Sequence, residues 1–536
     1  MIARSPRRAV RLDRGGRGIP SSAGGRAWSR GSRAAAATAI AAMLALVLAG
    51  CVPSFLQPPP HTSTPTGEQV DPALERFYHQ TLSWEPCGDE LGCATAIAPL
   101  SWEDPAAGEI DLALVRHVAT GERLGSLLVN PGGPGGSGYD FVHDSLDYAV
   151  GEPLKEHFDV VGFDPRGVGR STAVACYDAA GMDEYLYGIV PGEVGSDAWI
   201  EATAQKKSAF AAACADGTGE LLGEIDTRSA ARDLDLLRAV LGDEQLNYLG
   251  YSYGTFLGAS YAELYPDKVG RLVLDGAVDP TTTEEQVSAE QAAGFEQALR
   301  AYLEQCLGQE ECPFDGTVDE AMDEIGDLLD SVARSPLQGE DGRLVGADTF
   351  ITAIVYPLYS PDGWSYLDDL FTSVSFGQAD FALALADAYN GRNPDGSYSD
   401  NSTEAFLSVN CLDFEFQSDV EVMRQKAAAI AETAPLIGPY FGYGDLQCMD
   451  WPEPSRADRS PIHATGAAPI LVVGTTGDPA TPYDWAVSLA EQLDSGVLVS
   501  YDGEGHTAYN KSNQCVDSTV EEYFVNGTVP DADPQC

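Results

Sequence analysis

A Gly-x-Ser-x-Gly motif constrains the fold of this chain more than any other feature. Gly250-Tyr251-Ser252-Tyr253-Gly254 follows the apolar segment Leu246–Leu249 and precedes Thr255–Tyr265, which has helical spacing. The pattern predicts a strand, a sharp turn and a helix, with Ser252 at the turn. Glycines on both sides relieve crowding around a serine with strained backbone. The competing interpretation is a glycine-rich turn that carries an idle serine.

Short apolar segments alternate with helical segments over much of the chain. Several apolar segments are continuous, which is typical of parallel strands buried on both faces. Thr227–Leu241, with leucines at 234, 237 and 241, is a predicted helix between two of them. The alternation predicts an α/β fold with a mostly parallel, doubly wound sheet. The predicted strands are Ile110–Val115, Ser126–Asn130, Val160–Asp164, Leu246–Gly250, Arg271–Asp275, Ile470–Gly474 and Val497–Tyr501.

The alternation stops between about residues 281 and 461. This stretch has few strand patterns, and its helical patterns cover Glu284–Gln305, Val318–Val332 and Val420–Glu432. An insertion at this point is expected to lie over the carboxyl ends of the strands as a largely helical cap. The predicted domains are therefore a core of residues 73–280 and 462–536 and a cap of residues 281–461.

The first 50 residues have the pattern of an export signal. They hold nine arginines and one aspartate, and then the apolar segment Ala34–Leu48, which is too short for a stable membrane span. The segment ends in Leu48-Ala49-Gly50-Cys51, which resembles the lipobox of bacterial lipoproteins. Lipid on the Cys51 sulfur would anchor the protein to the outer face of the cytoplasmic membrane. An ordinary secretion signal, giving an extracellular protein, is the alternative. Residues 51–72, rich in Pro, Ser and Thr, are a predicted tether.

The composition excludes several kinds of partner. With 82 acidic and 31 basic residues, the formal net charge is −51, and it is −59 without the basic leader. A surface with this charge repels nucleic acid, so no nucleic-acid partner is expected. The chain has no CxxC and its histidines are scattered, so neither a metal nor a cofactor is expected.

Ten cysteines remain besides Cys51, an even number that predicts five disulfides in an exported chain. Pairing between cysteines adjacent in the sequence is the simplest pattern, because each such pair lies within one local segment. The number of cysteines alone leaves the other pairings open.

A nucleophilic serine needs a base, and the base needs a carboxylate that fixes its tautomer. In α/β-hydrolases the order along the chain is Ser, Asp or Glu, and His. Two histidines follow Ser252. His506, in a loop after a strand, is the predicted base, whereas His463 precedes a strand and lies at the wrong end. The predicted acid is Asp478, in the loop after Ile470–Gly474.

The rival acid is Asp275, which ends the predicted strand Arg271–Asp275. The acid is expected in the loop after the strand that precedes the strand leading to His506. Asp275 follows an earlier strand, so Asp478 is preferred.

An oxyanion formed at the serine needs two N–H donors. One is the backbone N–H of Tyr253, directly after the nucleophile. The other is expected in Asn130–Gly138 (NPGGPGGSG), where Gly133 is the first choice and Gly132 the second. A phosphate-binding loop is the competing interpretation, but no Gly-Lys-Ser or Gly-Lys-Thr follows.

Six motifs together resemble the actinobacterial tripeptidyl aminopeptidases, which are related to the prolyl aminopeptidases of the α/β-hydrolase fold. The resemblance runs from about Trp84 to Cys536. It implies a helical cap that closes the cleft and recognises the free amino end of a peptide. Prolyl enzymes have His-Gly-Gly-Pro-Gly in this loop, whereas this chain has Asn130-Pro131 before the glycines, which favours the tripeptidyl branch. The motifs are NPGGPGGSG (130–138), FDPRGVGRS (163–171), GYSYGT (250–255), YPDKVGRLVLDGAVDP (265–280), GDPATP (477–482) and GEGHT (503–507).

The function predicted from the sequence is a secreted serine exopeptidase that releases short peptides, tripeptides by resemblance, through an acyl-enzyme. Its substrates are expected to be peptides with free amino ends. An ammonium is most simply held by a carboxylate, and Asp413 and Glu415 are the candidates. The alternative is that both are ordinary carboxylates of the cap with no role in binding. An esterase or lipase on the same triad is the alternative. A non-catalytic binding protein is a third hypothesis, and the retained triad argues against it.

Overall fold

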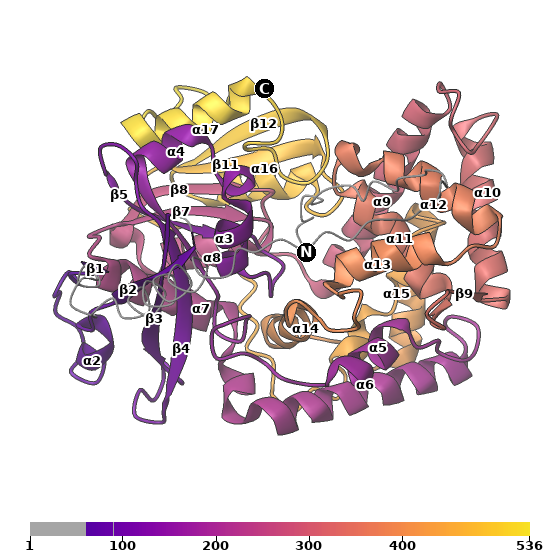
Figure 1. Ribbon diagram of the computed structural model, residues 1–536, viewed down its shortest axis with the longest axis horizontal. Helices are drawn as coiled ribbons and strands as arrows, with labels where there is room; N and C mark the ends of the chain where they lie inside the picture. The colour runs from indigo at the N-terminus through magenta and orange to yellow at the C-terminus, as the bar shows by residue number, and fades with distance from the viewer. Residues whose placement is uncertain (1–60, 89) are drawn as a thin grey trace, which may run out of the picture. The chain divides into compact units, whose positions relative to one another are not determined.

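The computed structural model describes residues 61–88 and 90–536, and a ten-stranded sheet runs through this part of the chain (Figure 1). The predicted signal, Cys51 and the start of the predicted tether lie outside the described residues. All the predicted strands are in the sheet, which confirms the α/β class. In spatial order its strands are β1 (His61–Thr62), β2 (Ser83–Gly88), β3 (Leu91–Pro99), β4 (Glu109–His117), β6 (Phe158–Phe163), β5 (Gly125–Asn130), β7 (Leu246–Tyr251), β8 (Val269–Asp275), β11 (Ile470–Gly477) and β12 (Gly496–Glu504).

The sheet combines an antiparallel edge with a parallel remainder. Strands β2, β3, β4 and β6 pair antiparallel, whereas β6, β5, β7, β8, β11 and β12 pair parallel. Every residue of β5 is buried. Leu128 packs into the core on one face, and Leu127 and Val129 pack into the core on the other. Continuous apolar strands therefore predicted correctly that both faces are covered.

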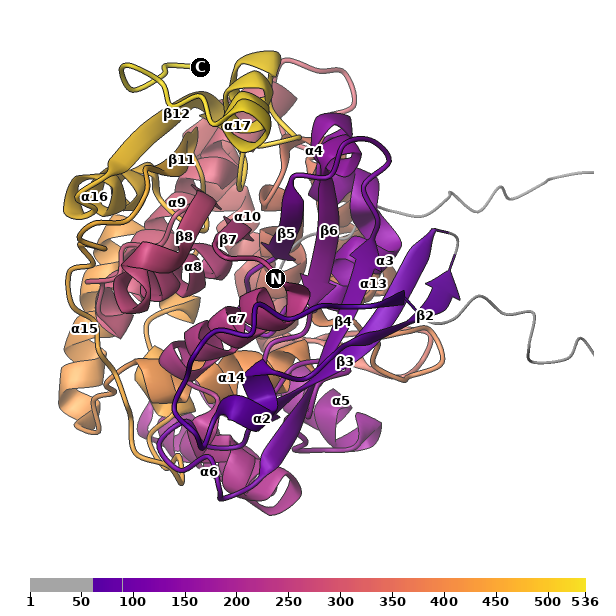
Figure 2. The same ribbon diagram turned by 90° about the vertical axis from the view of Figure 1, so that its left-hand side faces the viewer.

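Helices cover the two faces of the sheet in separate groups (Figure 2). One apolar cluster joins the sheet to α7, α8 and α16, and the other joins it to α3, α4 and α17. The predicted helix 227–241 is α7. The bounds are α3 (Gly138–Ala149), α4 (Glu152–His157), α7 (Thr227–Leu241), α8 (Tyr253–Leu264), α16 (Tyr483–Gln492) and α17 (Gln514–Asn526), and a short helix, α2 (Glu75–Tyr78), precedes β2.

Residues 281–461 are largely helical and have a hydrophobic cluster of their own. The three helices predicted there from the sequence correspond to α9, α10 and α15. The helices of this region are α9 (Glu284–Cys306), α10 (Val318–Arg334), α11 (Ala347–Leu358), α12 (Ser365–Ser375), α13 (Asp380–Asn390), α14 (Ser402–Asp413) and α15 (Val420–Thr433), and a small hairpin joins β9 (Leu337–Gln338) to β10 (Leu344–Val345).

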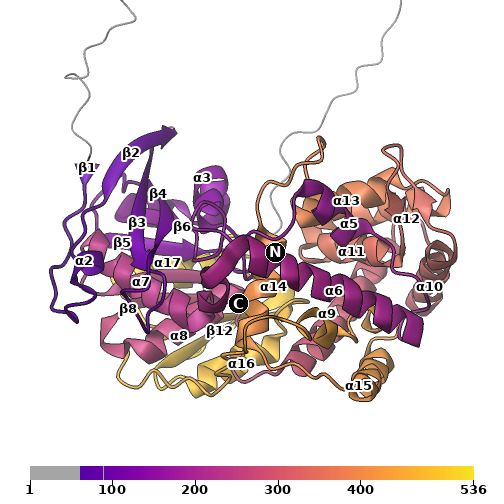
Figure 3. The ribbon, with the colours of Figure 1, turned by 90° about the horizontal axis from the view of Figure 1, so that it is seen from below.

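Two helices from outside the predicted cap pack against this region. They are α5 (Ala179–Tyr187), which packs on α11, and α6 (Asp197–Thr218), which packs on the short helix Gly444–Gln447. In Figure 3, which is seen from below, α6 runs in front of the helices of residues 281–461. The layer over the sheet edge is thus built from two separate insertions, of which the sequence predicted one.

The described end of the predicted tether is packed against the core, which corrects that part of the prediction. Ser63 N donates to Leu82 O at 3.0 Å, and Thr66 N donates to Ala239 O at 2.9 Å. Glu68 accepts from Arg238 and Lys268. A composition rich in Pro and Thr predicts an extended chain, but it cannot reveal ion pairs to residues far along the sequence.

The five predicted disulfides are present, each between cysteines adjacent in the sequence. The pairs are Cys87–Cys93, Cys176–Cys214, Cys306–Cys312, Cys411–Cys448 and Cys515–Cys536.

Among the described residues, none of the helices combines the length and the apolar character needed to cross a membrane.

The motif Phe163–Ser171 has a structural role. Arg166 is fully buried and its guanidinium donates to both carboxylate oxygens of Asp233, each at 2.7 Å. It also donates to the carbonyls of Pro99, Leu100 and Glu224. This bidentate pair ties the loop after β6 to α7, close to the carboxyl ends of the central strands.

Candidate active site

Ser252 lies at the tight turn between β7 and α8, with φ 56° and ψ −128°. A side chain on either flanking glycine would collide with backbone. A Cβ on Gly250 would lie 2.4 Å from Gly254 O, and one on Gly254 would lie 2.9 Å from Asn130 O. The motif therefore needs both glycines so that the chain can turn sharply enough to present the serine.

Asp478 and His506 form a hydrogen-bonded pair at the ends of β11 and β12. His506 Nδ1 lies 2.9 Å from both carboxylate oxygens of Asp478, and both side chains are almost fully buried. Asp478 also accepts from Ala480 N, Thr481 N and Thr481 Oγ1, each at 2.9 Å, and from Thr507 N at 3.2 Å. Because a carboxylate only accepts, Nδ1 carries the proton and Nε2 of the neutral ring is left as an acceptor.

The rival acid Asp275 and the rival base His463 have other hydrogen-bond partners. Asp275 is buried and accepts from Ala508 N and Tyr509 N, so it holds the loop that follows His506 rather than the imidazole itself. Burial raises the pKa of Asp275 to about 6. His463 is exposed, and its Nδ1 lies 3.0 Å from Gln492 O. The geometry thus favours Asp478 and His506 over both alternatives.

Ser252 and His506 both lie beside the segment Asp275-Gly276. Ser252 N donates to Asp275 O at 2.9 Å, and a Cβ on Gly276 would lie 3.2 Å from His506 Cε1. In the part of the chain that the structure describes, no hydrogen bond joins Ser252 Oγ to His506. Such bonds are often long in a free enzyme and shorten when substrate binds.

The glycine loop after β5 distinguishes between Gly133 and Gly132, the two candidates for the second oxyanion donor. Gly132 N donates to Asn130 Oδ1 at 2.9 Å, so this N–H is already used. The N–H of Gly133 has no partner among the described residues, and Gly133 lines the cavity beside Ser252 and Tyr253. The loop therefore leaves the N–H of Gly133 free to donate, and Tyr253, the first residue of α8, lines the same cavity.

Ser252 opens into a cavity of about 520 Å³ between the sheet edge and the helices above it. Gly133, Tyr253 and Thr481 line its sheet side. His506 does not line it; its ring contacts Tyr359, with the ring centroids 5.5 Å apart. Eleven of the other lining residues are aromatic: Tyr185, Trp199, Phe256, Tyr389, Phe406, Phe414, Phe416, Tyr440, Phe441, Tyr443 and Trp485.

The two predicted amino-end anchors differ in position. Asp413 is buried and lines the cavity, and it accepts from Thr227 N at 3.1 Å and from Thr227 Oγ1. Burial raises the pKa of Asp413 to about 7. Glu415 is exposed and is not part of the cavity lining, contrary to the prediction. Its neighbours Phe414 and Phe416 both line the cavity, so Glu415, between them, points to the opposite side.

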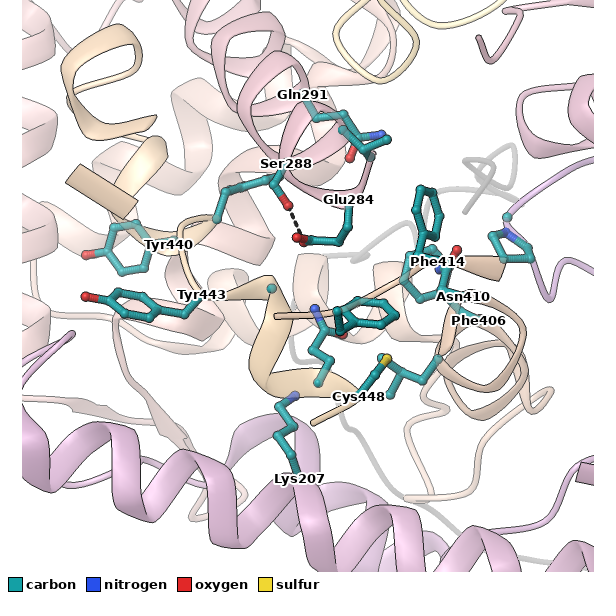
Figure 4. A pocket seen from close by; sticks show the side chains of 18 of the residues that line it. Lys207, Glu284, Ser288, Gln291, Phe406, Asn410, Phe414, Tyr440, Tyr443 and Cys448 are labelled. Carbon is teal, nitrogen blue, oxygen red and sulfur yellow. Dashed lines mark hydrogen bonds between the residues drawn. The ribbon is translucent and has the colours of Figure 1, made fainter. Parts of the chain in front are cut away.

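The cavity also contains charged residues that the sequence did not identify. Figure 4 shows Lys207 on one side, on α6, and Glu284 beside Ser288 on α9. Lys206 and Asp348 line the cavity as well. No motif marks these residues, since they come from three helices far apart in the sequence. Within the described part of the chain, no group of His, Cys, Asp and Glu could hold a metal ion.

Two family models match parts of the chain: an alpha/beta hydrolase fold over residues 125–320 and a TAP-like protein over residues 434–536. Serine protease Hip1 of Mycobacterium tuberculosis is 34% identical, with 92% of this chain and 96% of the relative covered. Carboxylesterase B of the same organism is 38% identical, with 85% and 89% covered. A tripeptidyl aminopeptidase of Streptomyces lividans is 30% identical, with 87% and 88% covered.

The chain belongs to the tripeptidyl aminopeptidase family. The predicted resemblance is thereby confirmed, and so is the predicted class of enzyme, a serine hydrolase related to peptidases. The family is not uniform in the names of its members, which include a protease, an aminopeptidase and a carboxylesterase. The residues that line the cavity are therefore the best guide to what this member of the family cleaves.

Proposed function

We propose that the protein is a serine exopeptidase that releases short peptides from free amino ends through an acyl-enzyme. The observation that carries this proposal is the cavity itself. It connects Ser252 at the strained turn with buried carboxyl groups on the cap side, within a volume of about 520 Å³. That size is typical of sites that enclose a small ligand, and a long chain threading through would need an open groove.

In the proposed mechanism, His506 Nε2 takes the proton of Ser252 Oγ as the oxygen attacks the scissile carbonyl. Asp478 holds the ring through Nδ1 and stabilises the imidazolium that forms. The oxyanion is bound by the N–H groups of Gly133 and Tyr253. The imidazolium then protonates the leaving amine, and water, activated by the same base, releases the peptide from Ser252.

We place the amino end of the substrate at Glu284, with Asp413 as the second candidate. Both oxygens of Asp413 already accept from Thr227. In Glu284 one oxygen accepts from Ser288 Oγ at 2.8 Å, and the other has no partner in the described chain. Burial raises the pKa of Glu284 to about 7, and an ammonium beside it would favour the ionised form.

The test is a series of chromogenic tripeptide amides with free and acetylated amino ends. Acetylation should lower kcat/KM by about a hundredfold or more, because losing a shielded ion pair costs a few kcal/mol. Glu284→Gln should remove most of this discrimination, whereas Glu415→Gln, a change at an exposed carboxylate, should leave it intact. Equal cleavage of free and acetylated substrates by the unaltered enzyme would rule out the exopeptidase. Discrimination that survives Glu284→Gln but not Asp413→Asn would move the anchor to Asp413.

An esterase is the second candidate, and the 38% identity to carboxylesterase B favours it. The same series, extended with acyl esters of matched length, separates the two functions. An esterase should hydrolyse the esters and leave the peptide amides intact.

We also infer that the protein is exported and carries lipid on Cys51. Five disulfides support an oxidising compartment, and the basic and apolar leader supports export. Intact-mass analysis of the native protein should show a diacylglycerol adduct on an amino-terminal Cys51. A mature amino terminus at another residue would contradict the anchor.

A further inference from the structure

The cavity contains positive charges that have no carboxylate oxygen within 4.0 Å. In a chain with 82 acidic residues, almost every lysine and arginine of the described part has a carboxylate oxygen within 4.0 Å. Three of the exceptions line the cavity, namely Lys206, Lys207 and Arg459. The exceptions within residues 61–88 and 90–536 are Lys206, Lys207, Arg271, Arg459 and Lys511.

Arg459 has two hydrogen bonds and two ring contacts within the protein. It donates to Thr282 O and Thr282 Oγ1 and lies over the rings of Phe256 and Phe414. Each of the two lysines has one hydrogen bond, and the Nζ of each lies over the ring of Tyr185. Lys206 Nζ donates to Gly188 O at 2.9 Å, and Lys207 Nζ donates to Tyr185 OH at 2.8 Å. An ammonium has three N–H donors, so each lysine can donate further hydrogen bonds to a ligand.

The surroundings of Lys207 favour a bound anion. Its Nζ lies 4.5 Å from the ring centroid of Tyr185, and Lys206 is its neighbour on α6. Burial lowers the pKa of Lys207 to about 8. Asp348, on α11, acts on both ammonium groups through its charge, but it lies beyond 4.0 Å from each. Burying an ammonium costs free energy unless a counter-charge accompanies it, and a ligand carboxylate would supply that counter-charge.

A purely structural role does not explain this arrangement. A lysine that only supports the fold can extend into solvent or pair with one of the many carboxylates, as Lys155 does with Asp147 and Glu152. Lys206 and Lys207 instead line the same cavity as Ser252. Any ligand that they bind therefore occupies the space in which the substrate is expected to lie.

We propose that Lys206 and Lys207 form a subsite for a carboxylate of the substrate. The proposal rests on the peptidase function proposed above and specifies its substrate class as peptides that place an acidic group at this end of the cavity. The carboxylate has two possible sources. It is either an acidic side chain in the segment that is released, or the carboxyl end of a very short peptide.

The test compares substrates that differ in one charge. The first pair of arms uses tripeptide p-nitroanilides with Glu or Gln at the first or second residue, which have no free carboxyl end. The second pair uses free tetrapeptides and their carboxyl-terminal amides. We expect the charged member to have a kcat/KM at least about tenfold higher in one of these pairs, as for a charge-assisted hydrogen bond. The pair that shows the preference identifies the source.

Lys206→Met/Lys207→Met should abolish the preference, so that the charged and neutral members have kcat/KM values within about twofold of each other. A melting temperature and a circular dichroism spectrum like those of the unaltered enzyme show that the variant folds. Lys155→Met, the change of a lysine on α4 that is paired, should leave the preference unchanged. The subsite is overturned if the ratio of kcat/KM between the charged and the neutral member is about one in every pair for the unaltered enzyme. It is also overturned if a preference survives the double substitution.

The two proposals fail in different ways. If acetylated and free substrates are cleaved equally, the exopeptidase fails, while the ratio between Glu and Gln substrates still reports on the lysines. If only esters are hydrolysed, p-nitrophenyl esters of a dicarboxylic acid and of its monoamide supply the same comparison, again with and without the two lysines.

Discussion

The sheet side and the cap side of the candidate active site differ in how completely their charged groups are satisfied. On the sheet side, Asp478 accepts hydrogen bonds from three backbone N–H groups, a threonine hydroxyl and the ring of His506. On the cap side, Glu284 uses one oxygen and Lys207 has a single hydrogen-bond partner. The difference suggests a division of roles: the sheet side is organised before substrate arrives, and the cap side is completed by the substrate.

The largest expected effect comes from disturbing the organised side. In Asp478→Asn, the amide oxygen would keep the bonds from Ala480 N and Thr481 N, so the NH2 group would face His506 Nδ1. The ring would then adopt the wrong tautomer, and kcat should fall by about ten thousandfold with little change in KM. Steady-state kinetics on a tripeptide amide measure this, with Asp484→Asn, at an exposed carboxylate on α16, as the control. A loss below about tenfold would contradict the assignment of Asp478.

A second prediction concerns the support of the sheet side. Arg166→Met leaves the buried carboxylate of Asp233 without its bidentate partner, so the free energy of unfolding should fall by about 3–5 kcal/mol. Arg170→Met breaks an exposed pair with Asp140 and should cost no more than about 1 kcal/mol. Urea unfolding with the disulfides intact measures both. Equal losses of unfolding free energy in the two variants would show that the buried pair stabilises the fold no more than the exposed pair does.

A third prediction uses pH to examine the cap side. Asp413 has a folded pKa of about 7, raised from 3.8, so the folded state holds this proton at a pH where the unfolded chain has lost it. Stability from this group is therefore full below about pH 4 and falls as pH rises toward 7. Asp413→Asn should remove a decline of about 4 kcal/mol between about pH 4 and 7, since one pKa unit is worth about 1.4 kcal/mol and the pKa rises from 3.8 to about 7. Glu415→Gln, at an exposed carboxylate, should leave the profile unchanged. An equally steep decline in Asp413→Asn would place the titrating groups elsewhere.

The sheet side could be predicted from the sequence because its residues follow strands. Apolar runs locate the strands, parallel strands end at one edge, and the loops after β7, β11 and β12 therefore bring Ser252, Asp478 and His506 to the same edge. The preference for Asp478 over Asp275 used the same argument. The triad assignment itself stays a prediction until Ser252 and its partners are tested.

The cap side could not be predicted in this way. Its charged residues come from α6, α9 and α11, whose packing depends on contacts between distant segments rather than on a motif. The sequence placed the ammonium anchor on Asp413 or Glu415 because both are acidic and close to the end of the cap. Residue type alone does not show that one side chain points inward and its neighbour outward.

The central claim, that Ser252 is a nucleophile activated by His506, is tested most directly by covalent labelling. A fluorophosphonate should label one residue of the native protein, which peptide mapping should identify as Ser252. Ser252→Ala should lose both the label and turnover, with a fall in rate on the order of a millionfold. Label on another residue, or turnover that persists in a contaminant-free Ser252→Ala preparation, would contradict the account.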